Sequence, residues 1–152
     1  MTTKLIRLSK SCLSQKEVSA VTDVLEAEYL GMGPLVGQFE DDLTSYLGNQ
    51  AVCVSSGTAA LHLALQAIDV GPGDEVIVQS LTYVASFQAI SATGASPIAC
   101  DVDPETLTID IRDLESKINK NTKAIMPVHY SGGVGNLDAI YCIAKKYNLR
   151  VI

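Results

Sequence analysis

From Gln50 onward, short runs of β-branched residues alternate with longer stretches that have helical periodicity. This alternation constrains the fold most, because a strand, a helix and a second strand in succession form a right-handed crossover that leaves the two strands parallel. Strands are predicted near Ala51–Val54, Glu75–Gln79, Pro97–Asp101, Lys123–Val128 and Leu149–Ile152, and helices near Thr58–Ile68, Val84–Thr93, Ile111–Ile118 and Leu137–Tyr147. The sequence therefore predicts an α/β fold, with a mainly parallel sheet and helices on both faces.

The first fifty residues predict two helices instead. Ser14 and Glu17 have the spacing of a capping box, in which each side chain accepts a hydrogen bond from a free backbone N–H at the helix start. Apolar residues at helical spacing extend this helix to about Tyr29. Pro34 suits the first turn of a second helix, which Gly48 ends.

The composition argues against several classes of partner. Hydrophobic residues make up 47% of the chain and charged residues 18%, which favours strands that are buried on both faces. The net charge is −6 and the basic residues are scattered, so no nucleic-acid partner is expected. No apolar stretch approaches the ~20 residues of a membrane helix, so we expect a protein without a membrane partner.

The cysteines and histidines do not predict a metal site. Cys12, Cys53, Cys100 and Cys142 are far apart and form no C-x-x-C pair, and the chain has only two histidines. Three of these cysteines fall in predicted strands or helices, where a thiol packs like a small apolar side chain. That use of cysteine is typical of a reducing compartment, and we expect a cytoplasmic protein.

Polar and aromatic residues gather where the predicted parallel strands end, which is where open α/β sheets bind their ligands. Gly57 allows close approach of a ligand, and the helix that begins at Thr58 presents free N–H groups and a partial positive charge to an anion. Tyr83 follows the second strand and His129 the fourth. Each signal alone has a plainer interpretation: Ser56 or Thr58 as a helix cap, Tyr83 as a filler between helix and sheet. Together they favour a cofactor that carries a phosphate on an aromatic ring.

Other nucleotide or hydrolase motifs are missing from the sequence. The stretch Gly132-Gly133-Val134-Gly135 lacks the spacing of a dinucleotide-binding loop, and no P-loop motif is present. No G-x-S-x-G elbow is present for a hydrolase.

Five stretches of the chain occur in an order and spacing typical of one enzyme family. They are GPLVGQFEDDLTSYLG, VSSGTAALHLAL, GPGDEVIVQSLTYVAS, DVDPETLTID and AIMPVHYSGGVGNLDAI. Together they resemble the DegT/StrS family of pyridoxal-phosphate-dependent nucleotide-sugar aminotransferases. The resemblance implies part of the large domain of a fold-type I transferase. Residues 1–30 would be an N-terminal helical segment, and residues 31–152 the N-terminal part of that domain, incomplete at its C-terminus.

The resemblance also implies a role for particular residues. Gly57, Thr58 and Ala59 would bind the phosphate of pyridoxal 5'-phosphate. Tyr83 would stack on the pyridine ring, and Gln88 would lie near the cofactor and the substrate. The anion site would then be the reason for the small polar residues before the helix at Thr58.

The resemblance implies substrates and an assembly as well. The substrates would be an amino acid, glutamate in the leading interpretation, and a keto-sugar linked to a nucleotide. Gly33 and Pro34 would lie in a loop near the sugar, and His129 is a further candidate for substrate binding. The protein would be a homodimer.

Two features of the family have no counterpart in the sequence. The acidic residue that pairs with the ring nitrogen follows the strand on which this sequence ends, and the Schiff-base lysine lies further on. We therefore expect no catalytic residue in this chain, which would be an inactive part of a longer enzyme. Three alternatives stay open: a sugar dehydratase of the same family, a non-catalytic folding or assembly unit, and a cofactor-binding α/β domain of another kind.

Overall fold

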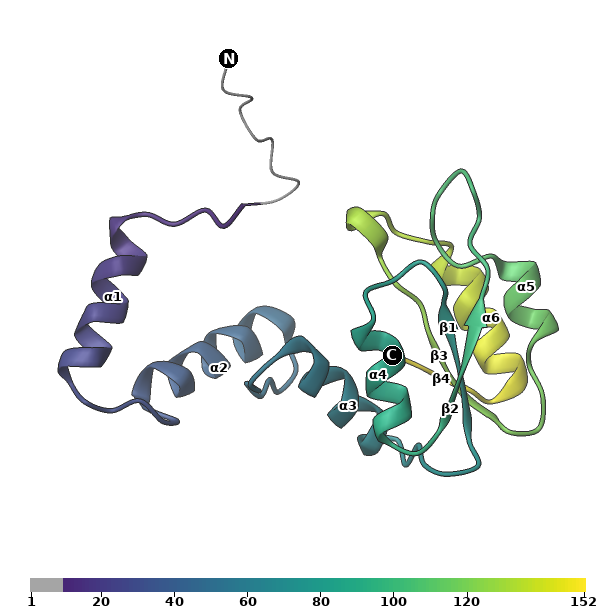
Figure 1. Cartoon of the computed structure of the whole chain (residues 1–152), viewed down its shortest axis with the longest axis horizontal. Coiled ribbons are helices and arrows are strands. Elements are labelled where there is room, and N and C mark those ends of the chain that lie inside the picture. Colours follow the sequence, from purple (N-terminus) through teal and green to yellow (C-terminus); the bar gives the residue numbers. More distant parts are fainter. Residues whose placement is uncertain (1–9) are drawn as a thin grey trace, which may run out of the picture. The chain divides into compact units, whose positions relative to one another are not determined.

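The computed structural model describes residues 10–152, which belong to two units, one ending at Cys53 and the other beginning at Val54 (Figure 1). The first unit contains the helices α1 (Gln15–Glu26) and α2 (Pro34–Leu47). The second contains, in chain order, α3 (Gly57–Ala67), β1 (Glu75–Gln79), α4 (Ala85–Ala92), β2 (Ser96–Cys100), α5 (Ile111–Ser116), β3 (Thr122–Met126), the 3-10 helix η1 (Tyr130–Gly132), α6 (Leu137–Tyr147) and β4 (Arg150–Val151).

The two helices of the first unit begin where local signals predict, but α1 ends at Glu26 rather than near Tyr29. The backbone N–H of Ser14 donates to Glu17 Oε2 at 2.6 Å, and the N–H of Lys16 donates to Ser14 Oγ at 3.2 Å, which confirms the capping box. Helix α2 begins at Pro34 and ends before Gly48, whose φ of 70° is left-handed and suits glycine. Neither helix contains a buried residue.

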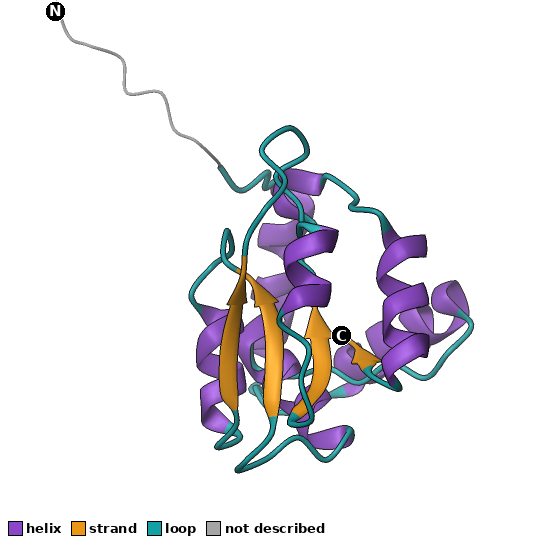
Figure 2. Ribbon diagram, turned by 90° about the vertical axis from the view of Figure 1, so that its right-hand side faces the viewer, coloured by secondary structure: helices purple, strands orange, loops and turns teal. Residues whose placement is uncertain are grey.

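The second unit is built on a parallel sheet, whose strands Figure 2 shows side by side. The strand order is β2-β1-β3-β4. Ile77 of β1 pairs with Ile98 of β2 on one side and with Ile125 of β3 on the other. The strands are parallel because a helical crossover separates each from the next along the chain. This arrangement confirms the predicted fold class.

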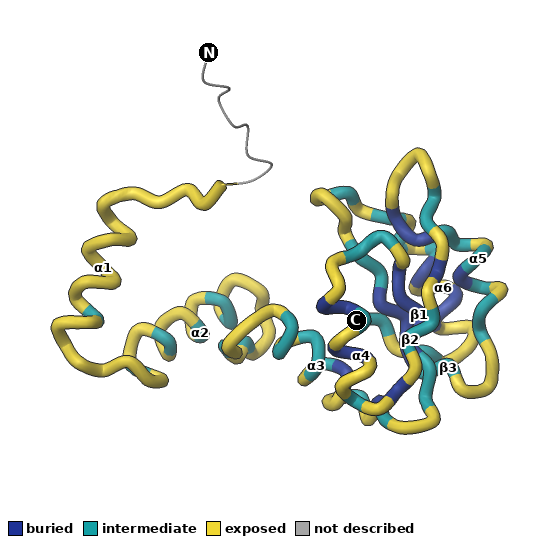
Figure 3. Tube along the Cα trace, viewed as in Figure 1, coloured by how far each residue is buried: buried dark blue, intermediate teal, exposed yellow. Residues whose placement is uncertain are grey.

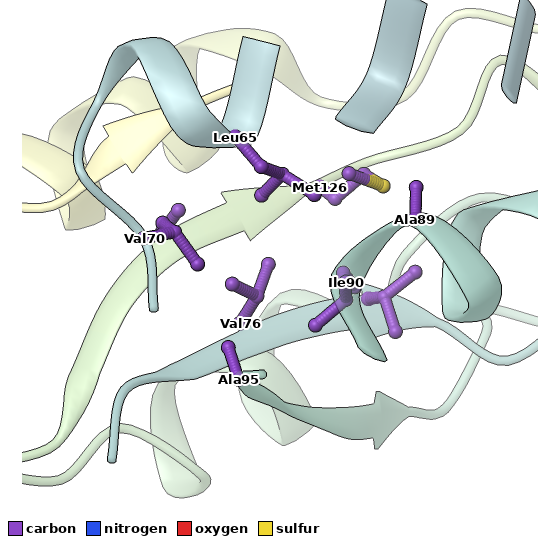
Figure 4. Packing of buried hydrophobic residues seen from close by; sticks show 9 residues of the cluster. Leu65, Val70, Val76, Ala89, Ile90, Ala95 and Met126 are labelled. Atoms are coloured by element: carbon purple, nitrogen blue, oxygen red, sulfur yellow. The ribbon is translucent and has the colours of Figure 1, made fainter. Parts of the chain in front are cut away.

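Helices cover both faces of the sheet, because side chains of a strand point alternately to its two sides. Val76, Val78 and Met126 pack with Leu65 of α3 and Ile90 of α4 on one face (Figure 4). On the other face, side chains of β1, β2 and β3 pack with those of α5 and α6; this cluster comprises Ile77, Cys100, Ile109, Leu114, Ile125, Ile140, Ile143 and Ala144. Figure 3 shows the buried stretches gathered along the sheet of this unit.

One predicted strand is absent, and the predicted strand at residues 123–128 ends early. Residues 51–54 form no strand, because the N–H of Ala51 donates to Thr44 Oγ1 at 3.0 Å and that of Cys53 donates to Glu40 Oε1 at 2.7 Å. Side chains of α2 thus take the hydrogen bonds that a neighbouring strand would need. Strand β3 ends at Met126 rather than at residue 128, and Pro127, which follows, has no N–H to continue the ladder.

Within residues 10–152, no helix is both long and apolar enough to cross a membrane.

Cys100 is expected to resist alkylation while Cys12 and Cys142 react. Cys100 is fully buried, and its burial raises the pKa of the thiol to about 12, whereas Cys12 and Cys142 are exposed. The thiolate is the reactive form, so the raised pKa leaves Cys100 almost entirely as the unreactive thiol at pH 8. Peptide mass spectrometry after iodoacetamide treatment of the folded chain measures this, and urea-unfolded chain is the control. Equal labelling of Cys100 and Cys142 in the folded chain would contradict the packing described above.

Candidate functional site

Ser56 caps helix α3 without using all the free amides of its first turn. The N–H of Ala59 donates to Ser56 Oγ at 3.2 Å, and the N–H of Ala60 donates to the carbonyl oxygen of Ser56 at 3.0 Å. Among residues 10–152, the N–H groups of Gly57 and Thr58 have no acceptor. The helix cap and the anion site are therefore compatible, because they use different amides of one turn.

The beginnings of α3 and α4 line one cavity of about 600 Å³. Gly57 and Thr58 contribute from α3, and Tyr83 and Ser86 contribute from the loop before α4 and its first turn. The rest of the lining is small or apolar: Ala60, Leu61, Ala64 and Ala85. The structure thus brings the predicted anion site and the predicted aromatic side chain to the same cavity.

The Tyr83 side chain is available for a ligand. The residue is 79% exposed, so its ring does not fill a gap between helix and sheet. A flat ligand of moderate size fits beside it, since binding sites for small molecules combine apolar walls with a few placed polar groups. Stacking is the contact that an open aromatic face offers to a flat ring.

The electrostatics of the cavity favour an anion. The N-terminus of α3 borders it and carries a partial positive charge from the free amides of Gly57 and Thr58. Among the described residues that line it, none is charged at neutral pH, so a carboxylate does not oppose a phosphate there. Free amides, a hydroxyl at Thr58, an aromatic ring and an apolar wall suit the two halves of pyridoxal phosphate.

Other predicted cofactor and substrate residues lie away from the lining of this cavity. The amide of Ala59 is already taken by the Ser56 cap. Gln88 is exposed on α4, and His129 is exposed where η1 begins; neither belongs to the described lining.

Gly33 and Pro34 lie in the first unit and border a separate cavity of about 320 Å³. Val24 and Tyr29 are among the other residues of its wall. A Cβ atom at Gly33 would lie 2.8 Å from Tyr29 Cδ1, so glycine allows the close approach of this ring. The apolar wall and the small volume suit a compact ligand or a packed side chain.

The sequence did not single out the apolar and hydroxyl residues that line the cavity beside Tyr83. Ala60, Leu61 and Ala64 follow Gly57 at helical spacing, so this periodicity could have placed them on the face that carries the anion site. Ser86 offered no such signal, because its place depends on how α4 packs against α3.

Comparison with known proteins shows the family of this chain. The family model described as "DegT/DnrJ/EryC1/StrS aminotransferase family" matches residues 11–152. A UDP-4-amino-4-deoxy-L-arabinose–oxoglutarate aminotransferase from Shewanella sediminis (strain HAW-EB3) is 39% identical over 153 residues, which cover 100% of this chain and 39% of the relative.

Solved structures give the same result. The crystal structure of DesV from S. venezuelae is 38% identical with a TM-score of 0.80, over 90% of this chain and 38% of that one. NtdA from Bacillus subtilis, with the cofactor PMP bound, is 36% identical with a TM-score of 0.85, over 90% of this chain and 32% of that one. The chain thus spans 32–39% of the length of these relatives. The chain belongs to the DegT/DnrJ/EryC1/StrS aminotransferase family.

Proposed function

We propose that this chain is the cofactor-binding part of a pyridoxal-phosphate-dependent enzyme that transfers an amino group from an amino acid to a nucleotide-linked keto-sugar. Family membership and the sugar aminotransferases among its relatives support the reaction class. The observation that carries the proposal is that Gly57, Thr58 and Tyr83 line one cavity.

Different residues of the cavity bind different parts of the cofactor in this proposal. The free amides of Gly57 and Thr58 bind the phosphate, with the Ala59 turn shaping the site, and the Tyr83 ring stacks on the pyridine. For Gln88, which is exposed on α4 outside this lining, we propose a polar contact beside the cofactor and the substrate. Once bound, pyridoxal phosphate supplies an electron sink for negative charge at the carbon that carries the amino group.

The finer parts of the proposal concern substrates and assembly. Glutamate is the proposed amino donor, Gly33 and Pro34 lie near the sugar, and His129 is a substrate-binding residue. The enzyme works in the cytoplasm as a homodimer. The UDP-sugar named for the Shewanella relative supports a nucleotide-linked substrate.

We propose that the 152-residue chain binds the cofactor without catalysing the transfer. Among residues 10–152, no lysine lines the cavity, so no side chain there is placed to hold the cofactor covalently and to move the proton. Binding is therefore the property to test in this chain.

Pyridoxamine phosphate is the probe for this test, because it carries the same ring and phosphate but no aldehyde that would react with surface lysines. Isothermal titration calorimetry is expected to show one saturable site, and inorganic phosphate is expected to compete for it. Absence of binding, or binding that phosphate does not weaken, would overturn the proposal.

Replacing Tyr83 with alanine is expected to weaken pyridoxamine phosphate binding about tenfold, because a well-stacked aromatic pair contributes up to about 1.4 kcal/mol beyond the area it buries. Tyr83→Phe retains the stacking face and is expected to bind like the unsubstituted chain. Tyr141→Ala, an exposed tyrosine of α6 away from the cavity lining, is the matched control. Equal affinities of Tyr83→Ala and Tyr141→Ala would exclude stacking on Tyr83.

A further inference from the structure

The loop that carries Tyr83 is held by hydrogen bonds at both of its ends. At its start, the N–H of Ser80 donates to the carbonyl oxygen of Cys100 at 2.8 Å. At its end, Thr82 Oγ1 and Ser86 Oγ are 2.9 Å apart, which ties the loop to the first turn of α4. Between these anchors, the carbonyl of Leu81 accepts a hydrogen bond from a side chain of the sheet.

That side chain is Gln79, the last residue of β1. It is fully buried, and its Nε2 donates both to the carbonyl oxygen of Leu81 at 2.9 Å and to that of Leu107 at 3.0 Å. Its Oε1 is buried without a hydrogen-bond partner among the described residues. Burial of an amide that leaves one acceptor unpaired has an energetic cost, so the two donated bonds must matter to the fold or to the site.

Leu107 belongs to a second loop, which is held by hydrogen bonds of its own. Val102 and Ile109 pair in an antiparallel bridge, and the N–H of Asp103 donates to the carbonyl oxygen of Thr108 at 2.9 Å. The Asp103 carboxylate accepts hydrogen bonds from backbone amides of the same loop, which lowers the pKa of that carboxyl. Leu107 has a left-handed φ of 58°, a conformation that its surroundings must hold in place. Gln79 therefore ties the Tyr83 loop to a fixed support.

Gln79 has no direct way to contact a ligand in the cavity. Val76 and Val78 face α3 and α4, so strand alternation places Gln79 on the opposite face with Ile77. Any effect of Gln79 on the cofactor must pass through the loop. A primary amide suits this task, because it supplies two uncharged donors from a single nitrogen.

We propose that Gln79 is a positioning residue that orients Tyr83 for stacking on the cofactor, by holding the Leu81 carbonyl against the loop that contains Leu107. This inference rests on the proposed function, because it assumes that pyridoxamine phosphate and pyridoxal phosphate bind in the cavity.

The test compares two ligands. Gln79→Met keeps the length of the side chain but donates no hydrogen bond. It is expected to weaken pyridoxamine phosphate binding about tenfold, as Tyr83→Ala does, and to leave the affinity for inorganic phosphate unchanged, because the amides of Gly57 and Thr58 are untouched. Phosphate affinity is measured by ³¹P NMR titration. Ile77→Val, a smaller change on the same strand and face, is expected to change neither affinity.

A double-mutant cycle shows whether Gln79 affects cofactor binding through the ring of Tyr83. In the Tyr83→Ala background, Gln79→Met is expected to cause no further loss of pyridoxamine phosphate affinity, since the positioned group is already gone. If Gln79→Met does not give a folded chain, Gln79→Asn carries the same test, because its shorter amide cannot reach both carbonyls.

Three results overturn the assignment of Gln79. They are an unchanged affinity for pyridoxamine phosphate, an equal loss of affinity for both ligands, and a further tenfold loss in the Tyr83→Ala background. If the unsubstituted chain does not bind pyridoxamine phosphate at all, the proposed function fails as well, and this result is distinct from the other three.

Discussion

Replacing Gly57 with aspartate is expected to abolish phosphate binding while the chain stays folded. A Cβ atom at Gly57 has no atom within 4 Å, so the fold has room for the side chain. A carboxylate in the first turn of α3 also interacts favourably with the helix dipole, by about 0.3–1 kcal/mol. The same carboxylate lies beside the free amides that we assign to the phosphate. Stability and binding should therefore change independently.

The expected loss of affinity is at least about a hundredfold. Two unit charges about 4 Å apart repel each other by about 4 kcal/mol at the effective dielectric constant of a protein surface, and salt screens part of this. Each 1.4 kcal/mol corresponds to about a tenfold change in Kd. The aspartate also competes with the phosphate for the N–H groups of the first turn. No other single substitution in the cavity is expected to affect binding as strongly.

Calorimetric titration with pyridoxamine phosphate, together with urea unfolding, measures both properties. Gly57→Asn is the matched control, because it has nearly the same shape and no charge. The difference in affinity between Gly57→Asp and Gly57→Asn reports the charge alone. Identical affinities of these two variants would mean that the first turn of α3 does not bind an anion.

Replacing Ile125 with alanine is expected to lower the free energy of unfolding by about 3 kcal/mol, because removing a large buried aliphatic side chain costs the transfer free energy and leaves a cavity. Ile125 is 0% exposed and lies on β3, between β1 and β4. It packs in the cluster that joins the sheet to α5 and α6. Relaxation of neighbours from both helices cannot easily fill the space.

Urea unfolding followed by circular dichroism gives this free energy. Leu63→Ala is the control, since Leu63 is 51% exposed on α3 and should lose less than about 1 kcal/mol. The Ile125 substitution lies on the face of the sheet opposite to α3 and α4, so at urea concentrations where the variant is folded its affinity for pyridoxamine phosphate should be unchanged. Similar losses of stability for the two variants would contradict the description of the core.

The sequence predicted most elements because their signals are local. Strand β1 has the predicted bounds, and α6 spans the predicted residues 137–147, since apolar periodicity and caps act within a few residues. The predicted strand at residues 51–54 was wrong for the converse reason. A strand exists only if a neighbour accepts its hydrogen bonds, and here side chains of Thr44 and Glu40 bind that backbone instead.

The sequence predicted individual residues of the candidate site but not how they come together in one cavity. Thr58 and Tyr83 were identified from the residues that follow predicted strands, and the family resemblance agreed with them. The sequence did not indicate a role for Gln79, because its amide donates a hydrogen bond to the carbonyl of Leu107, 28 residues away in the chain. A single glutamine at the end of an apolar strand is not part of a periodic pattern, so the sequence pattern does not predict such a contact.

By itself, the sequence determined the alternation of strands and helices, the parallel sheet and the family, because each depends on short motifs and on their order. Only the tertiary structure decided that the first turns of α3 and α4 line one cavity, and that Gln79 joins two loops beside it. The physical reason is that such contacts depend on how helices pack on the sheet, and packing is set by many distant side chains together.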